Sequence, residues 1–109
     1  MLTADQVRAA ALSLDGAVEL PHHGFPSFRA GRIFATLPDP EHLHVMLHEG
    51  DIRAAAAEWP WCSEKWWGGK LSAVRVTLAD ADPGVVDELL RDAHRHAGGG
   101  ARRGSGQSW

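Results

Sequence analysis

An alternating stretch at residues 27–37 constrains the fold of this chain more than any other part of the sequence. Before Gly31, Phe28 and Ala30 alternate with polar neighbours. After it, two interleaved sets follow: Ile33, Ala35 and Leu37 in one, and Arg32, Phe34 and Thr36 in the other. Because successive side chains of a strand point to opposite faces of a sheet, this period of two predicts two strands with one buried face. Gly31 provides the reversal, since glycine takes positive φ without steric cost.

Helix signals stand on both sides of this hairpin. Residues 2–14 are predicted to be helical, with Thr3 as the N-cap and Gln6 three positions later, as in a capping box. Asp82 is the expected N-cap of a helix near the end of the chain, because a proline follows it at the first helical position. A short helix is predicted at residues 49–57, where four consecutive alanines give strong helix propensity.

Further strands are predicted at residues 17–20, 42–48 and 71–78, and residues 62–70 are expected to form a loop or an irregular hairpin arm. The order helix, antiparallel sheet, short inserted helix and C-terminal helix predicts an α+β two-layer sandwich. The helices are expected to cover the sheet face that carries Phe28, Ile33, Leu43, Val45, Val74 and Val76. The opposite face is then left to solvent or to a partner.

Composition narrows the class of protein. A chain of 109 residues fits one domain, assigned to residues 1–97, and residues 98–109 are a Gly/Ser/Arg-rich tail predicted to be disordered. The net charge of −3 argues against nucleic-acid binding through bulk charge alone. The single cysteine, Cys62, excludes an internal disulfide and fits a reducing compartment. Since no apolar run approaches the roughly 20 residues of a membrane span, and no signal peptide is visible, a cytoplasmic protein is expected.

The capped first helix, the hairpin Pro-His-x-x-x-Pro-Ser-Phe-Arg at residues 21–29 and the strand Ile-Phe-Ala-Thr-Leu at 33–37 together resemble the MmcQ/YjbR-like family of small bacterial proteins. The likeness covers residues 2–97 and is most specific at 22–37. It implies a frataxin-like α–β–α sandwich. Members of the family are commonly labelled DNA-binding because of a double-winged arrangement, and an established activity is lacking.

Strand alternation also predicts a candidate binding face. It comprises Ser27, Arg29, Arg32, Phe34, Thr36, Met46, Arg75 and Thr77, with Lys65, Trp66, Trp67 and Lys70 at its rim. Basic side chains neutralise phosphates, and exposed aromatic rings stack on bases. The leading hypothesis is therefore a non-enzymatic DNA-binding module. In it Arg29, Arg32, Lys65, Lys70 and Arg75 contact phosphates, and Trp66 or Trp67 stacks on a base. The alternative for the same residues is an ordinary solvated sheet face.

A second hypothesis starts from the four tryptophans at residues 59–67, namely Trp59, Trp61, Trp66 and Trp67. Tryptophan is enriched at protein interfaces as well as in cores. This cluster predicts a contact with a protein partner or a small ligand, or the seam of a homodimer.

Histidines raise the question of a metal site. His42 and His44 share a strand face, and His22 or His48 offers a further ligand. Stable sites need three or four convergent ligands with supporting groups, so no metal and no cofactor are expected. Iron is disfavoured as well, because the first helix region carries only two carboxylates, Asp5 and Asp15.

A catalytic role is not expected either. Cys62 has Lys65 three residues on, and a nearby ammonium lowers a thiol pKa. However, no base for this thiol can be identified, and the sequence contains no nucleophile-elbow or phosphate-loop motif. The prediction is a protein without catalytic residues.

Overall fold

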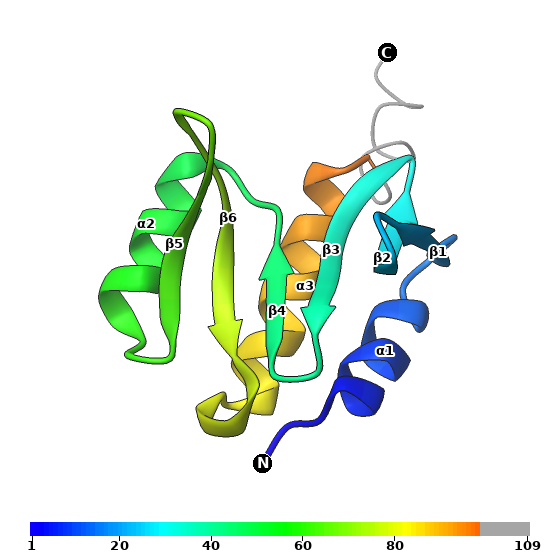
Figure 1. Ribbon diagram of the computed structural model, residues 1–109, viewed down its shortest axis with the longest axis horizontal. Coiled ribbons are helices and arrows are strands. Elements are labelled where there is room, and N and C mark those ends of the chain that lie inside the picture. The colour runs from blue at the N-terminus through cyan, green and yellow to red at the C-terminus, as the bar shows by residue number, and fades with distance from the viewer. Residues whose placement is uncertain (99–109) are drawn as a thin grey trace.

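The computed structural model describes residues 1–98 of the chain. The predicted tail therefore lies outside the described residues, apart from Gly98. The elements in chain order (Figure 1) are α1 (Ala4–Leu12), β1 (Val18–His22), β2 (Phe25–Ala30), β3 (Arg32–Asp39), β4 (His42–Val45), α2 (Glu49–Glu58), β5 (Cys62–Trp67), β6 (Lys70–Thr77), the short 3-10 helix η1 (Leu78–Asp80) and α3 (Pro83–His96).

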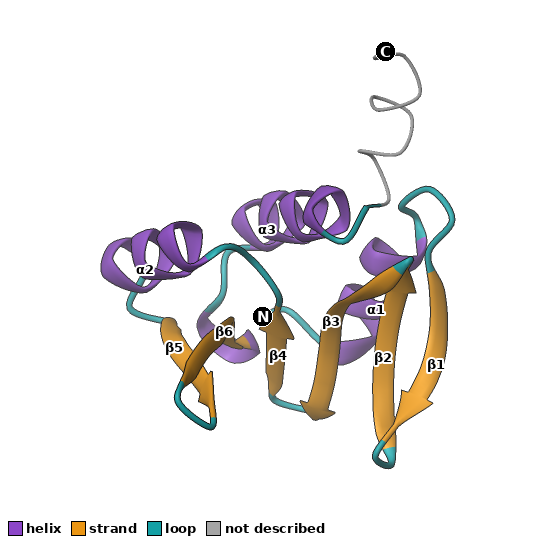
Figure 2. Ribbon diagram, turned by 90° about the horizontal axis from the view of Figure 1, so that it is seen from above, coloured by secondary structure: helices purple, strands orange, loops and turns teal. Residues whose placement is uncertain are grey.

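The six strands form one antiparallel sheet in the order β1-β2-β3-β4-β6-β5. Helices α2 and α3 lie over one face of this sheet, and the tips of the β1–β2 and β5–β6 hairpins project away from them (Figure 2). The predicted α+β two-layer sandwich is confirmed. No helix among residues 1–98 combines the length and apolar character that crossing a membrane requires.

Both predicted helix starts are confirmed by their caps. The Thr3 hydroxyl accepts from the Gln6 backbone N–H at 3.2 Å, and Thr3 N donates to Gln6 Oε1 at 2.9 Å, which completes the capping box. At α3, the Asp82 carboxylate accepts from the N–H groups of Gly84 and Val85 at 2.8 and 3.3 Å. These bonds satisfy amide donors that lack partners within the helix.

Two strand predictions need correction, and the structure decides between the alternatives for a third segment. β1 continues through Pro21 to His22, which is possible because β1 is an edge strand and proline has no N–H for a further neighbour. β4 ends at Val45 rather than His48. Residues 62–67 confirm the second of the two predicted alternatives, an irregular hairpin arm: β5 is the outer strand of the β5–β6 hairpin, with a register shift between Lys65 and Trp66.

A β-bulge in the central hairpin reverses part of the predicted alternation. Phe28 pairs with Ala35, whereas the next residue, Arg29, pairs with Ile33, so β3 has one residue more than β2 over this stretch. The extra residue is Phe34, which is fully buried and packs against α3. The prediction that Phe34 lies on the outer face and Ile33 in the core is therefore wrong.

The core lies between the sheet and the helices. Its strand contribution includes the predicted residues Phe28, Leu43, Val45, Val74 and Val76, all without exposed surface. The helices contribute Val7, Ile52, Val86 and Leu90. Burial of this apolar area is the main favourable term for folding. It also leaves the opposite face of the sheet uncovered by any helix.

Candidate nucleic-acid interface

One row of side chains crosses the uncovered face of the sheet from edge to edge. Strand register places these residues side by side in the order Leu20, Ser27, Thr36, His44, Arg75 and Ser63. Ser27, Thr36 and His44 are nevertheless buried. On a sheet face without helices, polar residues are shielded from solvent only when the side chains around them extend further from the sheet. The uncovered face is thus hollowed rather than flat.

A cavity of about 390 Å³ opens on this face, and we call it the hairpin cleft. Its lining residues are His22, His23, Phe25, Ile33, Thr36, Met46 and Trp67. The β1–β2 hairpin supplies one wall and Trp67 of β5 supplies the other, while β3 and the segment after β4 form the floor. The two hairpins flanking it project on the same side (Figure 2).

Three cations belong to the same face. Arg75 donates from Nη1 to His44 Nε2 at 3.4 Å, and the Lys65 ammonium lies 5.7 Å from the centre of the Trp67 ring. Arg29 is the neighbour of Ile33 across the β2–β3 pair and is half-buried. The wall and floor of the hairpin cleft are therefore bordered by fixed positive charge.

Carboxylates of the strands do not offset this charge. Two of them are directed toward the helices, where they form ion pairs, and the third lies at the end of β3. The pairs are Glu19 with Arg8 at 2.9 Å, Glu64 with Arg53 at 3.7 Å and Asp39 with His42 at 3.0 Å. No carboxylate lines the hairpin cleft among the described residues.

The imidazole of His44 stays neutral at physiological pH. Its burial, followed by the charges of Arg75 and Lys65, lowers the pKa of His44 from 6.5 to about 4. The neutral ring accepts from Arg75 through Nε2 and meets the Trp67 ring edge to face at 5.7 Å. His44 thus fixes the positions of an arginine and a tryptophan on the cleft face.

This arrangement predicts a pH-dependent stability. Because the pKa of His44 is lower in the folded state than in the unfolded state, the unfolded chain takes up the proton first. The free energy of unfolding should fall by about 2–3 kcal/mol as pH drops from 6.5 to 4 on account of this residue. Denaturant titrations across this pH range should show a smaller loss of unfolding free energy in His44→Gln than in the parent. The exposed control His23→Asn should lose as much unfolding free energy as the parent. If stability falls equally with pH in His44→Gln and in the parent, His44 is not the residue responsible.

The structure brings together four of the seven residues predicted to contact nucleic acid. Arg29, Lys65, Trp67 and Arg75 lie on the cleft face. Trp66 does not. Alternation along β5 places it on the α2 side together with Glu64, to which its indole N–H donates at 3.2 Å, and Arg53 stands 5.9 Å from its ring centre.

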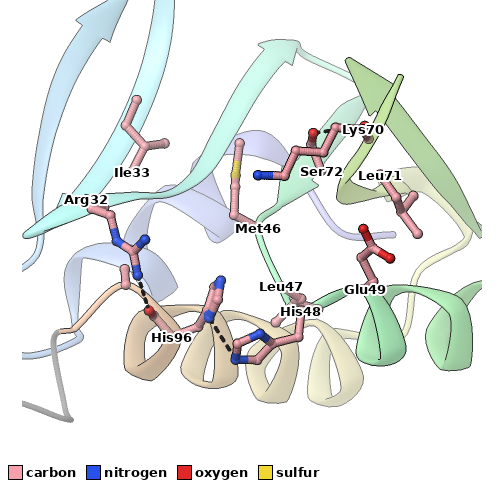
Figure 3. A pocket seen from close by; sticks show the side chains of 11 residues that line it. Arg32, Ile33, Met46, Leu47, His48, Glu49, Lys70, Leu71, Ser72 and His96 are labelled. Carbon is pink, nitrogen blue, oxygen red and sulfur yellow. Dashed lines mark hydrogen bonds between the residues drawn. The ribbon is translucent and has the colours of Figure 1, made fainter. Parts of the chain in front are cut away.

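Arg32 and Lys70 lie elsewhere as well, although they were predicted on the same face and its rim. Both line a second cavity of about 320 Å³ (Figure 3), which shares Ile33 and Met46 with the hairpin cleft. Arg32 Nη2 donates to the backbone carbonyl of His96 at 2.8 Å and so caps the C-terminal end of α3.

Sequence reasoning missed the wall formed by the β1–β2 hairpin. His22 pairs with Phe25 around a turn in which His23 and Gly24 both have positive φ, 52° and 86°. A two-residue turn of this kind is typical of a tight hairpin. The His-Gly pair before Phe25 could therefore have indicated the turn from the sequence. It could not have indicated which part of the fold the hairpin faces.

The predicted tryptophan cluster does not form one surface. Trp59 and Trp61 stack on each other with centroids 5.4 Å apart and pack against the core, whereas Trp66 and Trp67 lie on opposite sides of β5. A contact surface built from all four is therefore not present in the fold.

The histidines and the cysteine are also separated. His42 bonds Asp39, His44 bonds Arg75 and His48 bonds a histidine of α3. Within residues 1–98, no three His, Cys, Asp or Glu groups are arranged to hold a metal ion.

Cys62 is buried in the core, and burial raises its pKa to about 11. Its thiol is therefore protonated at neutral pH and not activated as a nucleophile. Lys65 cannot lower this pKa in the way the sequence suggested, because it lies on the opposite, outer face.

Comparison with solved structures finds this architecture in the crystal structure of protein DR2400 of Deinococcus radiodurans, which is described as a DUF419 domain. The TM-score is 0.72 and the identity 23%, over 86% of this chain and 77% of that one. The likeness is one of fold. No family model and no curated protein matches the sequence.

Proposed function

We propose that this chain is a non-enzymatic module that binds single-stranded DNA in the hairpin cleft. One observation carries the proposal. Three cations lie beside a recess lined by an aromatic ring, on a face where the strand carboxylates are directed away or paired at the far end. The net charge of −3 does not oppose this, because binding responds to the local field of the surface in contact.

The chemistry of each group fits a nucleic-acid strand. Arg29, Lys65 and Arg75 provide positive charge for phosphates, and release of counterions from the strand drives such binding. Trp67 is 44% exposed, and Phe25 stands on the opposite wall. Stacking of bases on aromatic side chains is tolerant of sequence, so the module should bind with little base preference.

Single strands suit the recess better than a duplex. In a duplex the faces of the bases are stacked on one another, whereas an unpaired base presents its face to a side chain such as Trp67. The resemblance to the MmcQ/YjbR-like family, with its double-winged arrangement and DNA-binding label, supports the same ligand class. The two hairpins that flank the cleft agree with such an arrangement (Figure 2).

Salt dependence tests the role of the cations. Neutralising Arg29 as Arg29→Gln should reduce the slope of log affinity against log salt by about 0.7, the value expected for one lost phosphate contact on a single strand. Arg53→Gln is the matched control, because Arg53 lies on the α2 side and is paired with Glu64. Fluorescence anisotropy with a labelled single-stranded oligonucleotide measures both slopes. Identical slopes for the parent and Arg29→Gln would exclude a phosphate contact at this residue.

A further inference from the structure

The second cavity gathers basic side chains from four separate parts of the chain. Arg32 comes from the start of β3, Lys70 from the start of β6, His48 from the N-cap of α2 and His96 from the end of α3. Figure 3 shows the Lys70 side chain extended toward Met46 across the space above the two histidines. We call this site the basic cavity. Only the fold brings these residues together, since they are far apart in sequence.

The two histidines form a hydrogen-bonded pair. His96 Nδ1 lies 3.0 Å from His48 Nε2, and the ring centroids are 3.9 Å apart. One nitrogen must donate and the other accept, so the pair shares one proton across this bond and keeps further ring nitrogens for a ligand. Arg32 uses one nitrogen on the His96 carbonyl, which leaves other guanidinium donors.

Negative charge near the basic cavity is limited. Glu49 is its one lining carboxylate within residues 1–98, and Asp51 acts on His96 from the first turn of α2. Burial, followed by His48 and Arg32, lowers the pKa of His96, while Asp51 opposes the shift. At this ring the charge of Arg32 acts more strongly than that of Asp51. His48 makes no side-chain cap bond at the start of α2, so its ring is not engaged with the helix backbone.

We propose that the basic cavity binds a phosphate monoester group, held by Lys70, Arg32 and the His48–His96 pair. A monoester dianion matches a site with two fixed cations and a histidine pair that offers one outer N–H donor when neutral and two when it takes up a proton. Because the cavity shares Ile33 and Met46 with the hairpin cleft, the group can belong either to the 5′ end of a DNA strand or to a free mononucleotide. The inference does not rest on DNA binding in the cleft.

Titration with inorganic phosphate tests the site directly, with the ring signals of His48 and His96 followed by NMR. Lys70→Met should weaken binding about tenfold, as expected for loss of a charged hydrogen bond. Arg53→Met, the control on the α2 side outside both sites, should leave phosphate affinity unchanged. Glu49→Gln should strengthen binding, because it removes a carboxylate from the cavity lining. A gain of affinity cannot arise from a variant that merely folds poorly.

Absence of saturable shifts, equal effects of Lys70→Met and Arg53→Met, or no gain in Glu49→Gln would each overturn the proposal. The two sources are distinguished by oligonucleotides with a 5′-phosphate or a 5′-hydroxyl and by adenosine 5′-monophosphate. A strand-end site predicts tighter binding of the phosphorylated oligonucleotide and loss of that advantage in Lys70→Met. A mononucleotide site predicts that adenosine 5′-monophosphate shifts the histidine signals, whereas neither oligonucleotide does. If neither oligonucleotide binds while inorganic phosphate does, the cleft proposal fails and the cavity proposal stands.

Discussion

Replacing Phe34 with alanine should destabilise the protein by about 3–5 kcal/mol, the range observed when a buried phenylalanine is truncated in a core. The ring has no exposed surface, and it meets the His94 ring of α3 edge to face at 5.7 Å. Its removal would leave a cavity between β3 and α3, because the surrounding backbone is fixed by the sheet and the helix. Urea denaturation followed by circular dichroism measures the loss.

Phe25→Ala is the matched control for this change. Phe25 lies half-buried on the wall of the hairpin cleft, so its truncation removes less apolar contact and should cost clearly less than Phe34→Ala. Equal losses in the two variants would contradict the bulge that directs Phe34 into the core.

Replacing Trp67 with alanine should weaken binding of single-stranded DNA by a factor of roughly 5 to 150. This corresponds to the ~1–3 kcal/mol that base stacking on an aromatic side chain contributes. Trp67 lines the hairpin cleft and is flanked by Lys65 and His44. The affinity is measured by anisotropy of a labelled oligonucleotide at low salt, where phosphate contacts keep even the weakened complex detectable.

Trp66→Ala provides the control within the same strand. Trp66 is the preceding residue and is equally exposed, at 45% against 44%, but it faces α2 with Arg53 and Glu64. Its truncation should leave DNA affinity unchanged. If both variants bind equally weakly, the loss reflects a general disturbance of β5, and the stacking role of Trp67 is refuted.

Local patterns predicted much of the fold because each has a local physical cause. The capping box at Thr3 and the N-cap at Asp82 depend only on residues within one turn of helix. The reversal at Gly31 depends on a φ of 88°, which glycine adopts readily. These features were predicted correctly, and so was the class of fold that they imply.

A bulge explains why the face predicted for Phe34 was wrong. A period of two assigns faces correctly only while the strand has no extra residue, and a bulge exchanges the two faces beyond it. This occurs at Phe34 in β3. Nothing in the composition of this segment marks the extra residue, so Phe34 was assigned to the wrong side. Trp66 was placed beside Trp67 for another reason: residues 62–70 were not predicted as a regular strand, in which adjacent side chains point to opposite faces.

The candidate site depended on pairings that local patterns do not contain. β4 pairs with β6 across the α2 and β5 segment, which brings Arg75 beside His44. The approach of the β1–β2 hairpin to Trp67 requires the curvature of the whole sheet. Residue types therefore indicated phosphate and base contacts, whereas their division between the hairpin cleft and the basic cavity required the fold.

Mapping by NMR tests the central proposal most directly. A ¹H–¹⁵N titration of the full chain with a short single-stranded oligonucleotide should shift amide signals in both hairpins and on the cleft floor. The expected residues are His22, His23, Phe25, Ile33, Thr36, Met46, Lys65 and Trp67. Signals of α1 and of the outer surface of α3 should stay in place. Shifts confined to the helices, or no shifts at low salt, would contradict the proposal that the hairpin cleft binds DNA.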